Sequence, residues 1–499
     1  MVNKIVIQLL HFCILFLPIC VDAQWQELDT GLELGLFPSP VKSEIHDSKI
    51  RVLRIDPREY KLVLLNASAN SDKKIKTARQ WSAENKLTAA INSSMYKEDY
   101  LTSVAYMRSG KHINNGILLK KDKAMFAFDR KSYDFPLVKL IDHQCDGFLA
   151  PKSFYRWSLR YGTLVQSIRM ITCRGKNVWR QQAKKWSTAL IATDKESNVL
   201  FVHVRSPYST HDLIDILLKL PLNIDRAMYA EGGPEAQLYI KTDDREYEFI
   251  GSYETGFNEN DDNQEAWPIP NVIGIRKFTQ KERIGIDYRH KKKEAKRRQL
   301  EMNSKLETSG GVVTADLLHE AETSLLKTVQ TDLIPSWYNM EWDFNGHSQI
   351  PQQGKIACGY FVTTILRDAG YNMDRVSLAR QPSSHIIKSL VDKKYVKAYS
   401  NTPIEKFVAS VKSWGEGLYI VGLDIHVGFL LYQDKKLRFI HSSYLPPETV
   451  IGEVAEDSKI LISSKYRVVG KLLPNPELMR KWINGEKIET VVCNSCFAQ

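Results

Sequence analysis

The stretch between Tyr288 and Leu300 constrains this chain most, because it contains no large apolar residue and can bury little surface. It includes the run Arg-His-Lys-Lys-Lys-Glu-Ala-Lys-Arg-Arg, and Ser-Gly-Gly follows at 309–311. A chain of 499 residues also exceeds what one hydrophobic core usually organises. The sequence therefore predicts two domains, 24–280 and 326–490, with a basic helical linker over 281–325 and a tail over 491–499.

The first 23 residues have the pattern of a cleaved signal peptide. Lys4 precedes a largely apolar run over 5–18, and Val21 and Ala23 are small residues at the positions that a signal peptidase reads. The apolar run is too short to span a bilayer comfortably, and no second candidate span follows. We expect a periplasmic or secreted protein that begins at Gln24; an uncleaved anchor is the alternative.

The net charge of +11 suits an anionic polymer as a partner. Charge alone favours envelope polymers and nucleic acid equally, but the export signal favours a cell-envelope glycan or peptidoglycan and excludes nucleic acid. The basic run at 289–298 is most often a solvated helix or linker; contact with an anionic polymer or a membrane surface is the alternative. No integral membrane span, cofactor or metal is expected, and no feature specifies an oligomeric state.

Five cysteines remain once the signal peptide is removed, and five cannot all pair. Proximity in sequence predicts the disulfides Cys145–Cys173 and Cys493–Cys496, which leaves Cys358 as a free thiol. The terminal Cys-Asn-Ser-Cys is also compatible with a redox or zinc motif, although no further ligands accompany it.

Both halves of the chain alternate helical and strand patterns, which predicts α+β or mixed α/β domains. In the first half the predicted helix over 210–220 has Ser209 or Thr210 as its N-cap, and strands are predicted at 50–55, 61–65 and 199–204. In the second half, helices are predicted at 315–329 and 356–369, and strands at 417–423, 427–432 and 437–441.

Cys358 begins an amphipathic helix, where unpaired backbone N–H groups and the helix dipole favour the reactive thiolate. Acyl transfer also needs a proton shuttle, and histidine supplies one near neutral pH. A hairpin turning at 433–436 would bring His426 and His441 together. We expect Cys358 to be the nucleophile, His426 the general base and His441 the group that orients it. A buried cysteine with two incidental histidines is the alternative.

Three motifs of this half, at 357–361, 426–429 and 439–442, read Ala-Cys-Gly-Tyr-Phe, His-Val-Gly-Phe and Phe-Ile-His-Ser. Together they resemble the NlpC-type cell-wall cysteine peptidases of the papain-like superfamily, over roughly 330–470. The resemblance implies a papain-like α+β fold and cleavage of amide bonds in peptidoglycan-type peptides by Cys358, His426 and His441. Ala357 replaces the usual Asp, and the segment before His426 is long, so the substrate is left open.

Three segments of the first half carry polar and glycine residues at strand ends: 90–96, 186–194 and 230–237. In the last, Glu231 and Glu235 flank a Gly-Gly-Pro turn. Glycines let backbone N–H groups approach a ligand, and a carboxylate can perform acid–base chemistry on a sugar. In isolation such a turn is more often only a turn.

Taken in order, these segments resemble the phosphodiester glycosidase family, which has Ile-Asn-Gly-Gly-Phe-Phe, Arg-Thr-Ala and Asp-Gly-Gly-Gly-Ser at the corresponding places. The similarity runs over roughly 45–278. Ser187 stands where the family has Arg, and Glu231 where it has Asp, which implies altered specificity or lost activity. The resemblance implies a substrate site at Asn92, Thr188, Glu231, Gly232 and Gly233, with Arg205 and His211 as further candidates beside the loop 206–209.

Three functions follow from these readings. The first is a bifunctional envelope hydrolase with an amidase site and a sugar-1-phosphodiesterase site. The second is a glycan-binding protein with a degenerate glycosidase domain and one active domain. The third is an envelope scaffold without activity.

Overall fold

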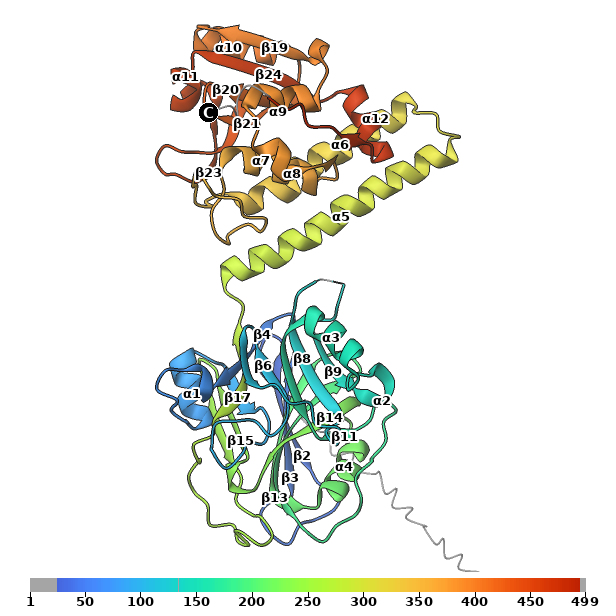
Figure 1. Ribbon diagram of the computed structural model, residues 1–499, viewed down its shortest axis with the longest axis vertical. Coiled ribbons are helices and arrows are strands. Elements are labelled where there is room, and N and C mark those ends of the chain that lie inside the picture. The colour runs from blue at the N-terminus through green and yellow to red at the C-terminus, as the bar shows by residue number, and fades with distance from the viewer. Residues whose placement is uncertain (1–24, 133, 494–499) are drawn as a thin grey trace, which may run out of the picture. The chain divides into compact units, whose positions relative to one another are not determined.

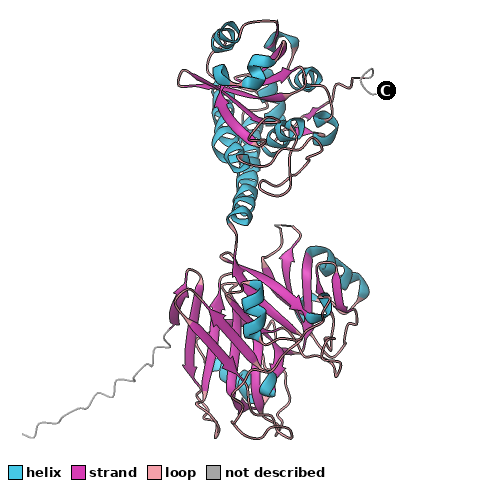
Figure 2. Cartoon of the chain, turned by 90° about the vertical axis from the view of Figure 1, so that its left-hand side faces the viewer, coloured by secondary structure: helices cyan, strands magenta, loops and turns pink. Residues whose placement is uncertain are grey.

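The structure, a computed structural model, describes residues 25–132 and 134–493. The chain divides into two compact units, Met1–Phe278 and Thr279–Gln499, and both mix helices with sheets, as predicted (Figures 1 and 2). The predicted signal peptide lies outside the described residues. Within the described part of the chain, no helix combines the length and apolar character that a membrane crossing needs.

Within residues 25–132 and 134–278, unit 1 contains three sheets and four α-helices. The seven-stranded sheet has the order β1 (Trp25–Asp29), β2 (Leu32–Pro38), β3 (Lys49–Ile55), β13 (Val199–Tyr208), β12 (Trp186–Asp194), β14 (Ile224–Gly232) and β11 (Arg169–Ile171). One five-stranded sheet has the order β7 (His112–Asn115), β6 (Met107–Ser109), β10 (Tyr161–Ser167), β8 (Ala124–Arg130) and β9 (Val138–Asp142). The other has the order β16 (Glu246–Ile250), β15 (Gln237–Lys241), β5 (Ala89–Asn92), β17 (Asn271–Lys277) and β4 (Tyr60–Asn66). The helices are α1 (Ala78–Asn85), α2 (His143–Asp146), α3 (Pro151–Arg160) and α4 (Thr210–Lys219).

The core of unit 1 explains why the strands are so apolar. One buried cluster takes side chains from all three sheets, among them Leu53, Phe126, Ile191 and Ile273. A second cluster packs the apolar face of α4 onto the seven-stranded sheet. Ser209 caps α4 as predicted, because its side chain accepts a hydrogen bond from the backbone N–H of Asp212. Since strands of this sheet are covered on both faces, they read as continuous apolar runs.

Unit 2 is built on a six-stranded antiparallel sheet with the order β19 (Val396–Ser400), β24 (Tyr466–Leu473), β20 (Gly417–Leu423), β21 (Val427–Gln433), β22 (Lys436–Ser442) and β23 (Val450–Val454). A short parallel pair joins β18 (Asn372–Met373) to β25 (Lys487–Ile488). The helices are α5 (Gln280–Thr308), α6 (Ala315–Lys327), α7 (Cys358–Asp368), α8 (Arg375–Ala379), α9 (Ser383–Leu390), α10 (Ile404–Lys412), α11 (Lys459–Ser463) and α12 (Pro476–Asn484). The predicted strands and helices of this half agree with these elements to within a few residues.

The basic segment expected to be a linker is instead part of unit 2. It forms the long helix α5, whose buried residues Tyr288, Ala295 and Met302 recur every seven positions on one face. The Tyr288 hydroxyl donates to the Asp368 carboxylate at 2.9 Å. The buried Gln299 amide donates to the carbonyls of Gly370, at 2.8 Å, and Trp482, at 2.7 Å. Helix α5 has few large apolar residues. It therefore also relies on a buried polar side chain, Gln299, and a buried small one, Ala295, to pack against the rest of unit 2.

Candidate functional sites

Two histidines on neighbouring strands face each other in unit 2. The turn between β21 and β22 has Asp434 and Lys435 at positive φ, 50° and 62°, which is the pattern of a two-residue type I′ hairpin. His426 comes directly before β21, and His441 lies near the end of β22. The hairpin places His426 Nε2 2.9 Å from His441 Nδ1.

A glycine makes room for this pair. A side chain at Gly428 would bring its Cβ to 2.8 Å from His441 Cβ and 2.6 Å from the ring of Phe439. Such contacts are closer than packed carbon atoms allow. The glycine of the His-Val-Gly motif is therefore required by the position of the second histidine.

Cys358 is the first residue of α7 and a free, partly buried cysteine. The helix that it begins packs against β21, whose first residue is Val427, the residue that follows His426. Burial raises the pKa of the Cys358 thiol, and the N–H groups of Val427 and Gly359 offset only part of that shift. The helix start lowers this pKa as expected, but burial outweighs it, so the net shift is upward. The resting group is a neutral thiol, which needs a base to react.

The histidine pair is suited to act as that base in its neutral form. Burial, reinforced by the neighbouring His441, lowers the pKa of His426 well below its ordinary value of 6.5. Burial also lowers the pKa of His441, although Glu453 opposes the shift. Both side chains are therefore uncharged at neutral pH.

Glu453 is a member of this cluster that the sequence reasoning missed. His441 Nε2 lies 3.2 Å from Glu453 Oε1. Although burial opposes it, hydrogen bonds with His441 and Ser458 lower the pKa of Glu453. In the β22–β23 register, Glu453 stands opposite Phe439 and diagonal to His441, on the same face of the sheet. No local motif marks this residue; only the pairing of a third strand brings it to the site.

The hydrogen-bond chain assigns the ring protons. An ionised Glu453 can only accept, so His441 carries its proton on Nε2 and accepts on Nδ1. His426 then donates from Nε2, which leaves its Nδ1 lone pair free. This is the nitrogen that can take a proton from a thiol.

A second candidate site is a cleft of about 530 Å³ in unit 1. Its walls combine aromatic rings and carboxylates with one cation: Tyr96, Tyr100, Trp179, Trp186, Glu98, Glu231, Glu235, Glu254 and Lys97. Glu231 and Gly232 end β14, and Glu235 ends the short 3-10 helix Gly233–Glu235. Aromatic walls with a few converging polar groups are typical of sugar sites.

Three carboxylates of the cleft, those of Glu231, Glu235 and Glu254, hold protons unusually well. Burial, reinforced by Glu235 and Glu254, raises the pKa of Glu231 to about 8, although the N–H of Gly232 acts in the opposite direction. Burial and Glu254 raise the pKa of Glu235, and burial raises that of Glu254 against the charge of Lys184. Glu231 is therefore mostly a neutral acid at pH 7, and it can donate a proton.

Residues 85–276 match the family model of the phosphodiester glycosidases. The chain contains a phosphodiester glycosidase-like domain. The match covers less than half of the chain and lies within unit 1. No curated protein matches the chain.

The solved structures that the comparison matched share little sequence with the chain. A hypothetical protein from Synechocystis is 12% identical, over 49% of this chain and 62% of that one, with a TM-score of 0.35. The chain thus spans less than two thirds of that protein. The catalytic domain of zebrafish N-acetylglucosamine-1-phosphodiester alpha-N-acetylglucosaminidase, auto-inhibited by its pro-peptide, is 13% identical, over 51% of this chain and 86% of that one, also with a TM-score of 0.35.

The glycosidase-like domain brings only some of the expected residues to its cleft. Glu231 and Gly232 line it, whereas Asn92, Thr188 and Gly233 are not among its lining residues. Asn92 accepts from the backbone N–H of Gln237 at 2.7 Å and donates to the carbonyl of Glu235 at 2.9 Å. Thr188 is fully buried and pairs with Gly232 across β12 and β14. These residues hold the turn that carries the carboxylates.

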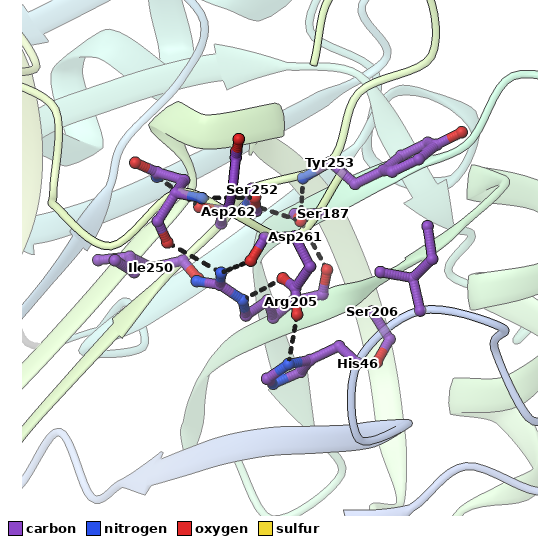
Figure 3. A network of polar contacts seen from close by, with 12 residues as sticks. His46, Ser187, Arg205, Ser206, Ile250, Ser252, Tyr253, Asp261 and Asp262 are labelled. Atoms are coloured by element: carbon purple, nitrogen blue, oxygen red, sulfur yellow. Dashed lines mark hydrogen bonds and ion pairs between the residues drawn. The ribbon is translucent and has the colours of Figure 1, made fainter. Parts of the chain in front are cut away.

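Arg205 and His211 do not line the cleft of the glycosidase-like domain. Figure 3 shows the Arg205 guanidinium surrounded by the loop after β16: it donates to the Asp261 carboxylate at 2.6 Å and to the carbonyl of Ile250 at 3.1 Å. The other Asp261 oxygen lies 3.0 Å from His46 Nδ1. His211 is the second residue of α4, and its Nδ1 lies 3.6 Å from Asp212 and 3.8 Å from Asp215 of the same helix. Arg205 is used to fix a loop, so it is not available to a substrate.

The predicted disulfide Cys145–Cys173 is present in the glycosidase-like domain. It joins α2 to the loop that follows β11 and leads to Trp179 in the cleft wall. Cys493 is also disulfide-bonded, but its predicted partner Cys496 lies outside the described residues.

Proposed function

We propose that this protein is an exported bacterial cell-envelope hydrolase that cleaves amide bonds in peptidoglycan-type peptides, with Cys358 as the nucleophile. The observation that carries the proposal is the hydrogen-bond chain from His426 through His441 to Glu453, together with a free cysteine at the start of α7, the helix that packs against β21 and β22. This is the arrangement of roles in a catalytic triad, in which a base is held in one tautomer by a second group. The resemblance of the three motifs to NlpC-type peptidases supports the substrate class.

In the proposed reaction, Cys358 sulfur attacks the amide carbonyl while its proton passes to His426 Nδ1. His426 then returns the proton to the leaving nitrogen, and the C–N bond breaks to leave a thioester. Water, deprotonated by the same imidazole, releases the acid and restores the thiol. His441 and Glu453 keep Nε2 of His426 protonated and stabilise the transient imidazolium.

Digestion of purified peptidoglycan by the mature chain tests this function. Mass spectrometry of the soluble products should show peptide fragments with wild type and none with Cys358→Ala or His426→Ala. A small residue at a helix start leaves little cavity, so Cys358→Ala should fold normally. Fragments released equally by Cys358→Ala would end the proposal, and no release by any form would favour the scaffold.

We propose export from the pattern of residues 1–23. The mature protein should begin at Gln24 and be recovered outside the cytoplasm. Cytoplasmic protein that keeps Met1 would contradict this.

We infer a second activity, hydrolysis of a sugar 1-phosphodiester, for the cleft of unit 1. The observation that favours it is Glu231, a neutral acid at pH 7 within a domain that matches the phosphodiester glycosidases. Water would add to the anomeric carbon as the C–O bond breaks, with its proton passing to a second carboxylate, Glu235 or Glu254. Glu231 would protonate the departing phosphate oxygen.

Release of free sugar from a methyl sugar 1-phosphodiester tests this activity. Glu231→Gln keeps the size and a hydrogen-bond donor but cannot transfer the proton, so it should lose turnover while still binding. A wild-type protein that binds but does not hydrolyse such compounds would leave the binding-protein hypothesis in place.

A further inference from the structure

A second pocket adjoins the carboxylate cleft of unit 1. This basic pocket, of about 410 Å³, is lined by Lys121, Lys123, Ile168, Arg169, Val178, Trp179 and Arg180. Ile168 and Trp179 also line the carboxylate cleft, so the two spaces share a wall. Ile168 and Trp179 therefore stand at the boundary between the two spaces.

The cations of the basic pocket are poorly neutralised. Lys121, Lys123 and Arg180 are exposed, and none forms an ion pair with any residue in 25–132 or 134–493. The Arg169 side chain is 10% exposed and pairs with Asp142 at 2.5 Å, but its Nε has no hydrogen-bond partner among the described residues. The neighbouring Asp122 is buried, and burial raises the pKa of its carboxyl against the charge of Lys121. An anion would meet a net positive surface here.

The carboxylate cleft has the opposite character. It presents four Glu side chains and a single Lys. A phosphate placed among them would be repelled by any that is ionised, whereas an uncharged sugar ring would be accepted against the aromatic walls. The charges of the two spaces therefore favour opposite ends of a sugar phosphate: the carboxylate cleft favours the sugar, and the basic pocket favours the phosphate.

Hydrogen bonds, an ion pair and a disulfide hold the wall that the two pockets share. The Trp179 indole N–H donates to the carbonyl of Arg169 at 2.7 Å. Asp142 pairs with Arg169 and also accepts from the backbone N–H of Cys173 at 2.9 Å. The disulfide of Cys173 with Cys145 fixes the same loop. A site held in this way loses little conformational entropy when a ligand binds.

We propose that the basic pocket binds the phosphate of a sugar 1-phosphodiester while the sugar occupies the carboxylate cleft. The inference rests on the glycosidase activity proposed for unit 1 and deepens it, because it assigns the anionic end of the substrate to Lys121, Lys123, Arg169 and Arg180. It also fixes the orientation of the substrate, with the group esterified to phosphate leaving on the side of Arg180.

Calorimetric titration of the mature chain with glucose 1-phosphate tests the proposal, with glucose as the uncharged comparison. The variant Lys121→Gln/Lys123→Gln/Arg180→Gln removes the three exposed cations and leaves Arg169 and the contacts that hold the shared wall intact. The control variant Lys42→Gln/Lys111→Gln/Lys195→Gln removes the same charge from unit 1 outside both pockets. Circular dichroism checks that all forms fold.

Wild type and the control should bind glucose 1-phosphate alike, and added salt should weaken the binding. The pocket variant should bind it roughly ten-fold or more weakly, because losing even one charge-assisted hydrogen bond corresponds to about that factor. Equal binding by wild type and the pocket variant, equal weakening of both variants, or no binding by wild type would overturn the proposal.

Hydrolysis of a methyl sugar 1-phosphodiester separates this inference from the proposed activity. Turnover by wild type with an unchanged KM in the pocket variant would overturn the basic pocket and keep the glycosidase. Binding that depends on the pocket without turnover by any form would keep the basic pocket and remove the glycosidase.

Discussion

His426 Nε2 lies 2.9 Å from His441 Nδ1, so one ring of the pair must donate to the other. Because His441 Nε2 faces the Glu453 carboxylate at 3.2 Å, the donor is His426. The lone pair on His426 Nδ1 is then the basic atom of the site. Neutral imidazoles and a neutral thiol make proton transfer part of the attack, rather than a step completed beforehand.

The two histidines should differ in how much activity depends on them. His426→Ala removes the base and should lower kcat/KM on a peptidoglycan peptide by roughly 100-fold to 10,000-fold. His441→Ala should cost less, since an orienting group tunes a base but does not replace it. A larger loss for His441→Ala than for His426→Ala would contradict the assigned roles.

The variant Glu453→Gln tests the last residue of the hydrogen-bond chain that begins at His426. The amide cannot hold His441 in one tautomer, so we expect roughly ten-fold lower kcat/KM with little change in KM. Glu453 raises the pKa of His441, so its loss should also shift the acidic limb of the pH–rate profile to lower pH. Glu456→Gln is the matched control, because that carboxylate pairs with Lys412 at 2.7 Å. If Glu453→Gln leaves both the maximal kcat/KM and the acidic limb of the pH–rate profile unchanged, Glu453 does not orient His441.

Glu231→Gln should stabilise unit 1 at alkaline pH. The folded-state pKa of about 8 lies above the ordinary value of 4.5, so stability from the protonated form is complete below pH 4.5 and lost as pH rises through 8. Above pH 8 the variant should gain about 1–3 kcal/mol, discounted because the side chain is partly exposed. Urea unfolding of wild type and Glu231→Gln at pH 4 and pH 8.5 measures this difference in the free energy of unfolding. An equal gain at both pH values would refute the raised pKa of Glu231.

The acid role of Glu231 also predicts a pH limit. Sugar release by unit 1 should fall as pH rises above about 8, because the proton to be donated is lost there. A pH profile that stays flat to pH 9.5 would show that no such acid is needed.

The Cys145–Cys173 disulfide closes a loop with a sequence separation of 28. Replacing both cysteines with Ala should lower the free energy of unfolding of unit 1 by about 3–4 kcal/mol on the chain-entropy estimate. Denaturant unfolding measures the loss. An unchanged midpoint would mean that the link adds no constraint.

Local patterns predicted much of the fold. The apolar stripe of α7, the strands β20 to β22 and the cap of α4 all follow from spacing within a few residues. The same reasoning placed His426 beside His441, because a short hairpin fixes its own register. It missed Glu453, which reaches the site only through pairing of β23 with β22.

Long-range packing explains the other points at which the structure differs from the expectations from sequence. The buried face of α5 was hidden because Ala295 and Gln299 are not large apolar residues, yet both are buried. Arg205 looked available in sequence, but a loop more than fifty residues away accepts its hydrogen bonds. The pKa of Cys358 depends on burial, which a helix start does not reveal.

Trapping the acyl-enzyme tests the central claim, nucleophilic attack by Cys358, most directly. The mature chain is mixed with the nitrophenyl ester of a peptidoglycan peptide and quenched in acid, and its intact mass and peptide map are recorded. The account predicts an added acyl group on Cys358 in wild type and none on Cys358→Ala. Ester hydrolysis that continues in Cys358→Ala, or an acyl group mapped to another residue, would contradict it.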